Sequence, residues 1–289
     1  MEQTNWYDKN YKLLLIIPIV LLILSSVYIG FFYAKNNDFI HKDVSLTGGT
    51  SVTIFEKINP ADLEQSLAGK LGEINTREIY DLITQEQKAV IIETTADGET
   101  TKRVLEEYLG YELNSENSSF EFTGSSLSES FYKQLLIAVL VAFFFMAIVV
   151  FIIFRSFVPS TAVILSAFAD ILMTLALADF LGIRMSSAGI VAFLMLIGYS
   201  VDTDILLTTR ILRRQEGTIN QRIIGAFKTG ITMTLTSLMA VVFALIIVSS
   251  FSPILTQIFT ILSIGLIFDI LNTWITNVSI LKWYMEWKK

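Results

Sequence analysis

The chain has 289 residues, of which 53% are hydrophobic and 17% are charged, and its formal net charge is −6. A soluble domain carries about 25% charged residues, so this composition excludes a wholly water-soluble protein, and the negative charge argues against a nucleic-acid partner. With no cysteine and a single histidine, His41, the sequence offers no thiolate metal site and little material for a Ser-His-Asp triad. We expect a membrane protein without a metal or a cofactor.

Six apolar runs are long enough to cross a bilayer, because a hydrocarbon core of about 30 Å needs about 20 helical residues. We predict six membrane-spanning helices, at residues 13–34, 135–154, 161–181, 185–209, 223–248 and 253–283. The first run lacks a clear small-residue cleavage site and is long enough to span, so we interpret it as an uncleaved helix rather than a signal peptide.

Residues 35–133, between the first two spans, have a different composition, with 18 acidic and 9 basic residues. Short strand-like and helical patterns alternate there, and Asn59-Pro60 is typical of a helix start, with an N-cap followed by proline. We predict strands near 52–55, 75–82, 88–94 and 119–123, and helices at 60–71 and 100–109. The order β-α-β-β-α-β predicts a ferredoxin-like α+β domain inserted into a polytopic helical membrane protein.

These patterns divide the chain into an N-terminus with the first span at 1–34, an inserted α+β domain at 35–133 and a five-helix membrane domain at 134–289. Basic residues gather in the loops on one side of the predicted bundle: Lys9, Lys12, Arg155, Arg210, Arg213, Arg214, Arg222, Lys282, Lys288 and Lys289. Because cytoplasmic loops carry an excess of Lys and Arg, we expect both termini in the cytoplasm and the inserted domain outside the cell membrane.

Four aspartates lie inside the predicted spans, where an ionisable side chain is costly and normally faces another helix or a water-filled path. They are Asp170, Asp202, Asp204 and Asp269. Three interpretations stay open: a protonated acid that bonds a neighbouring helix for structural reasons, a group that handles protons or ions, or a side chain that does not lie at the assigned membrane depth. Since Asp202 and Asp204 are two residues apart, they point about 200° from each other on a straight helix, and they can pair only if the helix unwinds locally.

The run Gly198-Tyr199-Ser200-Val201-Asp202-Thr203-Asp204, followed by Arg210, resembles the fourth-helix motif of the SecF protein-export membrane family, in its archaeal form. Three further segments agree: Leu46-Thr47-Gly48-Gly49-Thr50 resembles the TGGT segment after the first helix, Phe154-Arg155 the arginine turn after the second, and Asp170-Ile171-Leu172 the start of the third-helix motif. Bacterial members typically read Asn-Asp-Thr where this chain has Asp-Thr-Asp, so the acidic position is displaced by one residue on either side.

The resemblance implies a function as well as a fold. SecF belongs with the resistance-nodulation-division (RND) transporters, whose working unit has twelve membrane helices, so six helices imply a SecD-like six-helix partner. It implies an accessory subunit of the Sec translocation channel that uses a proton or sodium gradient to promote export of a polypeptide. No ATP-binding or hydrolase motif is present, so we expect no enzyme activity. The alternatives are a purely structural assembly subunit and half of an RND-type small-molecule exporter.

We expect Asp202 and Asp204, with Asp170 nearby, to form a protonatable or ion-binding centre, because a buried carboxyl group can load and release a proton when its surroundings change. Asp269 is a further candidate for ion coupling, and Arg210 is expected to mark the cytoplasmic mouth of the centre. Gly48 and Gly49 are expected to form a flexible or tightly turned connection into the inserted domain.

Overall fold

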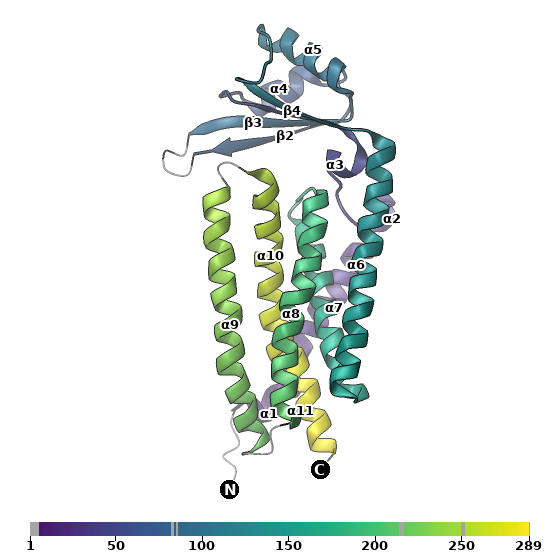
Figure 1. The fold of residues 1–289 in the computed structure, drawn as a ribbon, viewed down its shortest axis with the longest axis vertical. Coiled ribbons are helices and arrows are strands. Elements are labelled where there is room, and N and C mark those ends of the chain that lie inside the picture. Colours follow the sequence, from purple (N-terminus) through teal and green to yellow (C-terminus); the bar gives the residue numbers. More distant parts are fainter. Residues whose placement is uncertain (1–5, 82–83, 85, 214–216, 250–251, 289) are drawn as a thin grey trace.

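The computed structural model describes residues 6–81, 84, 86–213, 217–249 and 252–288. It consists of a bundle of long helices with a small β-sheet domain at one end, and the first and last of the described helices lie at the opposite end of the bundle (Figure 1). Within the described residues, six helices are long and apolar enough to cross a membrane, which confirms the predicted number. The chain is therefore a polytopic helical membrane protein.

The spanning helices follow the predicted apolar runs and extend beyond most of the predicted ends; only the end of the third span and the start of the fourth fall one or two residues inside the prediction. The first two spans are formed by α1 (Trp6–Leu14) with α2 (Ile16–Asn36), and by α6 (Ser125–Phe154). The next three are α7 (Phe157–Phe180), α8 (Ser187–Arg213) and α9 (Ile219–Val248). The sixth comprises α10 (Pro253–Leu271), the π-helix η1 (Asn272–Asn277) and α11 (Val278–Trp287).

Small residues let the inner helices of the bundle approach closely. Gly265 of α10 lies against Leu196 of α8, and a Cβ atom on this glycine would lie 2.5 Å from both terminal methyl carbons of the leucine. Gly230 of α9 makes room in the same way for the indole ring of Trp274 in η1. Close contact through small residues is how helices gain packing energy in lipid, where no hydrophobic effect drives them together. The contact between Gly265 and Leu196 places α8 and α10 side by side.

The sheet domain has the predicted β-α-β-β-α-β order. Its elements are β1 (Gly49–Ile54), α4 (Pro60–Leu67), β2 (Ile74–Tyr80), β3 (Gln87–Thr94), α5 (Gly98–Leu109) and β4 (Ser118–Thr123). The strands pair antiparallel in the order β2-β3-β1-β4, and α4 and α5 lie on one side of the sheet (Figure 1). This confirms the ferredoxin-like fold.

The two faces of the sheet differ because side chains alternate along each strand. In β1, Val52 and Ile54 are fully buried and pack with Leu105 of α5 in the core of the domain. The intervening residues Ser51 and Thr53 point to the other face, which turns toward the ends of the spanning helices (Figure 1). The bundle therefore meets a polar sheet surface.

The predicted end of the helix at 60–71 is wrong. This helix ends at Leu67, because Ala68 leaves the helical region with a ψ angle of 125° and Gly69 follows with a φ angle of 81°, which an α-helix does not contain. The predicted start is confirmed, since Asn59 accepts a hydrogen bond from the amide of Ala61 at 3.0 Å. The early stop turns the chain back into β2.

Candidate functional site

Three of the predicted aspartates meet in the middle of the bundle. Asp170 comes from α7, Asp204 from α8 and Asp269 from the last turn of α10, and the side chains of all three are 0% exposed. The sequence predicts these residues on the third, fourth and sixth spans, and the fold brings their side chains to one place. We refer to Asp170, Asp204 and Asp269 as the carboxyl cluster.

Asp170 is held by one neighbour on each side. Ser200 of α8 donates its hydroxyl to Oδ2 of Asp170 at 2.6 Å, and Asn272 of η1 donates its amide to Oδ1 at 2.7 Å. Ser200 belongs to the fourth-helix motif, so that motif contributes a hydrogen-bond donor to the carboxyl group of Asp170. Through these two bonds Asp170 joins α7 to α8 and to the sixth span.

Asp204 and Asp269 share a hydroxyl group. Oγ1 of Thr273 lies 2.9 Å from Oδ1 of Asp204 and 3.1 Å from Oδ1 of Asp269, and the amide of Asn277 donates to Oδ1 of Asp204 at 2.7 Å. A threonine hydroxyl carries one proton and can donate to only one of the two oxygens at a time. The second contact becomes a hydrogen bond when one of the carboxyl groups is protonated and donates to Thr273.

The charge of the carboxyl cluster follows from its surroundings. In the part of the chain that the structure describes, none of the three carboxyl groups forms an ion pair with Lys, Arg or His. Three unpaired negative charges inside a membrane bundle would be very costly, because burial disfavours a charge and like charges repel. The arrangement therefore favours a cluster that holds protons or a bound cation.

The expectation that Asp202 joins Asp204 in this centre is wrong. Helix α8 stays continuous from Ser187 to Arg213, so the two side chains point apart; Asp204 is buried and Asp202 is exposed on the outside of the isolated chain. The motif is split in the same way, since Ser200 is buried while Gly198 and Tyr199 face outward beside Asp202.

Arg210 does not reach the carboxyl cluster among the described residues. Its guanidinium group donates to the backbone carbonyl of Gly225 in α9 at 2.6 Å, about one and a half helical turns beyond Asp204. This bond fixes the loop side of α8 against α9. The arginine lies between the cluster and the end of the bundle opposite the sheet domain.

The π-helix supplies side chains that sequence reasoning missed. Asn272 and Asn277 are five residues apart, a spacing that one wide turn brings to one face and a regular α-helix does not. On a regular helix Asn272 lies three residues after Asp269 on a neighbouring face, whereas Asn277 falls off that face, so no helical pattern indicates it. A π-turn is a frequent feature of functional sites in membrane and soluble helices.

The glycines of the TGGT segment sit in a crowded turn. Thr47 ends the short helix α3 (Val44–Thr47), Gly48 and Gly49 have φ angles of 82° and 138°, and Thr50 donates its hydroxyl to the carbonyl of Ala96 at 2.7 Å. A side chain on Gly48 would strike the backbone of Ser125, and one on Gly49 the carbonyl of Thr94. The structure therefore shows a tight turn at this connection, one of the two forms expected for it.

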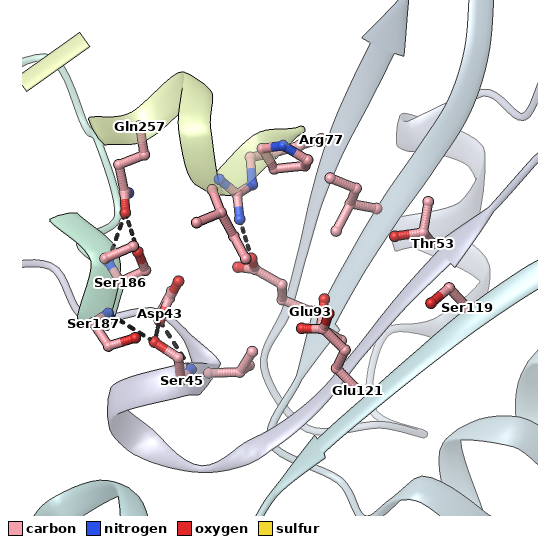
Figure 2. Close-up of a pocket in the computed structure, with 16 residues that line it drawn as sticks. Asp43, Ser45, Thr53, Arg77, Glu93, Ser119, Glu121, Ser186, Ser187 and Gln257 are labelled. Carbon is pink, nitrogen blue, oxygen red and sulfur yellow. Dashed lines mark hydrogen bonds and ion pairs between the residues drawn. The ribbon is translucent and has the colours of Figure 1, made fainter. Parts of the chain in front are cut away.

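A polar cavity separates the sheet domain from the bundle. It measures about 250 Å³ and lies between the polar face of the sheet and the first turns of α8 and α10 (Figure 2). Its charged lining residues are Asp43, Arg77, Glu93 and Glu121, and the hydrogen-bonding residues include Ser45, Ser186, Ser187 and Gln257. Glu93 is buried and forms an ion pair with Arg77.

Asp43 is the buried acid at this joint. Its Oδ1 accepts hydrogen bonds from the amide of Ser45 at 2.9 Å and from the hydroxyl of Ser45 at 2.6 Å, which caps α3. Burial raises the pKa of Asp43 to about 6; the negative charge of Glu93 adds to this effect, while the bonds from Ser45 and the charge of Arg77 oppose it. Sequence reasoning missed Asp43, because nothing in the sequence indicates that a bundle loop covers it.

The fold and the carboxyl cluster together define a polytopic membrane protein with ionisable groups inside its bundle, an arrangement typical of ion and substrate pathways. The family model of the protein export membrane protein SecD/SecF, C-terminal, matches residues 104–287. The chain belongs to the SecD/SecF family of protein-export membrane proteins. It is 44% identical to the protein-export membrane protein SecF of Methanocaldococcus jannaschii and 39% identical to that of Methanothermobacter thermautotrophicus; the matches cover 96% of this chain, and 96% and 94% of those relatives.

A solved structure has the same fold. SecDF from Thermus thermophilus, described as a translocon-associated membrane protein, superposes with a TM-score of 0.78 at 18% identity. The match covers 97% of this chain and 39% of the SecDF chain, so this chain spans well under half of that protein. At this level of identity the likeness shows the fold alone.

Proposed function

We propose that the chain acts with a SecD-like membrane subunit at the Sec translocation channel, and that it uses the transmembrane proton gradient to promote export of polypeptides. The observation that carries this proposal is the fully buried carboxyl cluster, which joins α7, α8 and the sixth span without a basic partner among the described residues. The translocon association is carried over from the description of the Thermus thermophilus protein.

The carboxyl cluster suits a proton-driven change of shape. Ser200, Asn272, Thr273 and Asn277 hold the carboxyl oxygens from two other helices, so gain or loss of a proton changes which hydrogen bonds those helices can share. A potential of 100 mV supplies roughly 2.3 kcal/mol per charge moved, enough to bias two arrangements of a packed bundle. A helix that shifts in response would act on whatever is attached to its end.

A partner is supported by the outer face of α8. Val191, Met195 and Tyr199 are exposed there, and Gly198 and Asp202 lie among them. A charged side chain near the middle of a spanning helix costs roughly 2.5–3.5 kcal/mol when it faces lipid. Cover by the helices of a SecD-like subunit removes that cost, and the half-sized set of six helices fits such a pairing.

The orientation is part of the proposal. The end of the bundle opposite the sheet domain carries the basic loops, including Arg155 and Arg222, which favours a cytoplasmic location for that end in the cell membrane. The sheet domain then lies outside the cytoplasm, where a polypeptide leaving the channel can contact it. In this role the chain is a mechanical subunit and not an enzyme.

The proposal is tested by Asp170→Asn, Asp204→Asn and Asp269→Asn in cells or vesicles that contain the partner and the channel. Each change keeps the size of the side chain but removes its titration, so we expect loss of most of the export that a proton ionophore abolishes in the unmodified protein. Co-purification of the partner should survive. Thr236→Val is a matched control, because the exposed Thr236 only donates to the carbonyl of Thr232 in its own helix, at 2.7 Å.

Full gradient-dependent export by all three variants would contradict the proposal and leave a purely structural assembly subunit. Gradient-driven efflux of a small molecule without any effect on export would favour the exporter alternative.

A further inference from the structure

We propose that Gln257 is the positioning residue through which movement of α10 reaches the sheet domain. This inference rests on the proposed proton-coupled function and identifies the contact that transmits it. Gln257 lies in the second turn of α10, on the wall of the polar cavity, and its side chain is 7% exposed.

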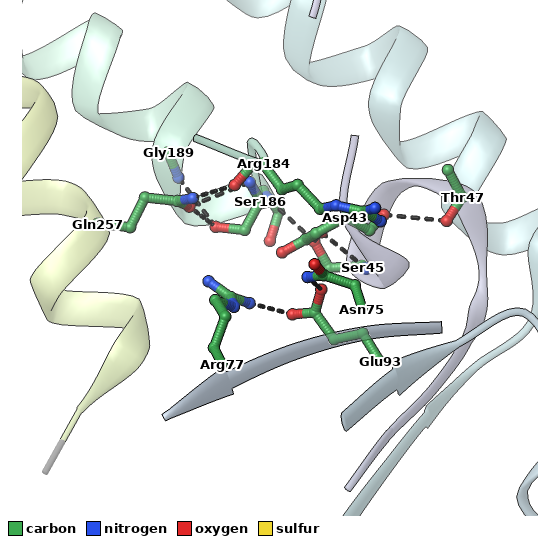
Figure 3. Close-up of polar contacts among 11 residues, drawn as sticks. Asp43, Ser45, Thr47, Asn75, Arg77, Glu93, Arg184, Ser186, Gly189 and Gln257 are labelled. Carbon is green, nitrogen blue, oxygen red and sulfur yellow. Dashed lines mark hydrogen bonds and ion pairs between the residues drawn. The ribbon is translucent and has the colours of Figure 1, made fainter. Parts of the chain in front are cut away.

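Both ends of the side-chain amide of Gln257 bond to the loop that precedes α8. Its oxygen accepts hydrogen bonds from the amide of Ser186 at 3.0 Å and from the hydroxyl of Ser186, while its nitrogen donates to the carbonyl of Arg184 (Figure 3). Gly189 leaves the space for this contact, since a Cβ atom there would lie 2.8 Å from the amide oxygen of Gln257. A buried amide that loses such bonds is left unsatisfied, so the loop and α10 are expected to move together.

The same loop is joined to the chain that leads into the sheet domain. The amide of Asp43 donates to the carbonyl of Met185 at 3.1 Å, and the amide of Met185 donates to the carbonyl of His41 at 2.5 Å. The amide of Ser187 donates to the hydroxyl of Ser45 at 3.0 Å (Figure 2). Residues 41–45 run directly through α3 into β1, so the loop is in contact with the base of the central strand.

At its other end α10 contributes Asp269 to the carboxyl cluster. Asp269 lies twelve residues after Gln257, about 18 Å along the same helix, and Thr273 and Asn272 follow at once in η1. Hydrogen bonds that change at Asp170 or Asp204 act on this span through Asn272 and Thr273. A rigid helix thus has the cluster at one end and the only side-chain amide of its outer turns, Gln257, at the other.

The test measures the distance between the sheet domain and the bundle in the full chain purified with its partner. Because the chain has no cysteine, Glu107→Cys on α5 and Ile247→Cys near the end of α9 accept one spin label each at exposed positions. Pulsed electron paramagnetic resonance then gives the distance between the two labels. It is measured with and without Asp204→Asn, which imitates a protonated carboxyl group, and each measurement is repeated in the Gln257→Leu background. Hydrogen exchange over residues 269–278 reports in parallel whether the cluster region itself responds.

We expect Asp204→Asn to shift the distance by about 2 Å or more, the scale of helix movements in switching proteins, and Gln257→Leu to abolish that shift while the exchange response of residues 269–278 persists. The control is Thr256→Val, which removes only a bond to the carbonyl of Ser252 in the same helix and should leave the shift intact. A shift that survives Gln257→Leu, or an exchange response without any shift, overturns the inference. Absence of the exchange response overturns the proposed function itself.

Discussion

Replacement of Asp43 by Asn should stabilise the joint between the sheet domain and the bundle at neutral pH. Asp43 is 7% exposed, and its Oδ1 accepts both bonds from Ser45, which an asparagine oxygen can also accept. The charged groups that face it are Glu93 and Arg77, which are paired with each other and lie on the sheet. The substitution therefore removes the charge and keeps the cap of α3.

The magnitude follows from the pKa of Asp43, which burial raises from 3.8 to about 6. One pKa unit corresponds to about 1.4 kcal/mol, so the charged form costs the folded state about 3 kcal/mol relative to the unfolded chain. Because the folded state retains its proton at a higher pH than the unfolded chain, stability falls as the pH rises from about 4 to about 6 and changes little above that range. Asp43→Asn should match the unmodified protein at pH 4 and exceed it by up to about 3 kcal/mol at pH 7.5.

Hydrogen exchange of the full chain in detergent, measured on peptides that cover residues 43–54 and corrected for the intrinsic rate at each pH, gives this comparison. Asp97→Asn is a control of opposite sign, since hydrogen bonds from Thr100 lower the pKa of the exposed Asp97, and its contribution is lost as the pH falls. Protection of residues 43–54 that increases from pH 4 to pH 6, or an Asp43→Asn protein with less protection at pH 7.5, would refute the reasoning.

Two further substitutions test the packing of the spans. Gly265→Ala should destabilise the bundle by about 1–3 kcal/mol because the added methyl group crowds Leu196. In thermal unfolding, Leu196→Ala in the same protein should recover part of that loss of stability. If the losses of stability from the two substitutions simply add, the close contact is contradicted. Gly198→Leu should leave the isolated chain folded, since nothing lies within 4 Å of a Cβ atom there, but it should reduce co-purification of the partner. Gly30→Leu on α2, where a Cβ atom also meets nothing within 4 Å, should leave co-purification unchanged. Retention of the partner by Gly198→Leu would remove the case for an interface on this face of α8.

Local patterns predicted the elements well, because the signals that define them lie within a few residues of each other. The apolar runs set the spans, and Asn59-Pro60 set the start of α4. The end of α4 was predicted too late, since the extended ψ angle of Ala68 and the positive φ angle of Gly69 stop the helix although the helical pattern continues to Leu71. Boundaries of this kind depend on backbone geometry that hydropathy does not report.

The candidate site was only partly predictable. The cost of burying a carboxyl group pointed to Asp170, Asp204 and Asp269, but the same cost pointed equally to Asp202, which the helix rotates to the outside. The sequence analysis did not select Gln257, a lone amide in an apolar run, because its partners are more than 70 residues away along the chain. Contacts at that separation depend on how helices pack, which no local pattern encodes.

The π-turn in the sixth span has a consequence for the two tryptophans near the end of the chain. On an uninterrupted α-helix, at about 100° per residue, Trp283 and Trp287 would lie on the same side as Asp269. The extra residue taken up within Asn272–Asn277 rotates α11 away from that phase, and the two indoles are 62% and 83% exposed. Tryptophan is enriched where a bilayer meets water, so a single inserted residue turns this pair toward the membrane boundary. Removal of one residue from the turn would rotate α11 so that Trp283 and Trp287 face the inside of the bundle instead of the membrane boundary.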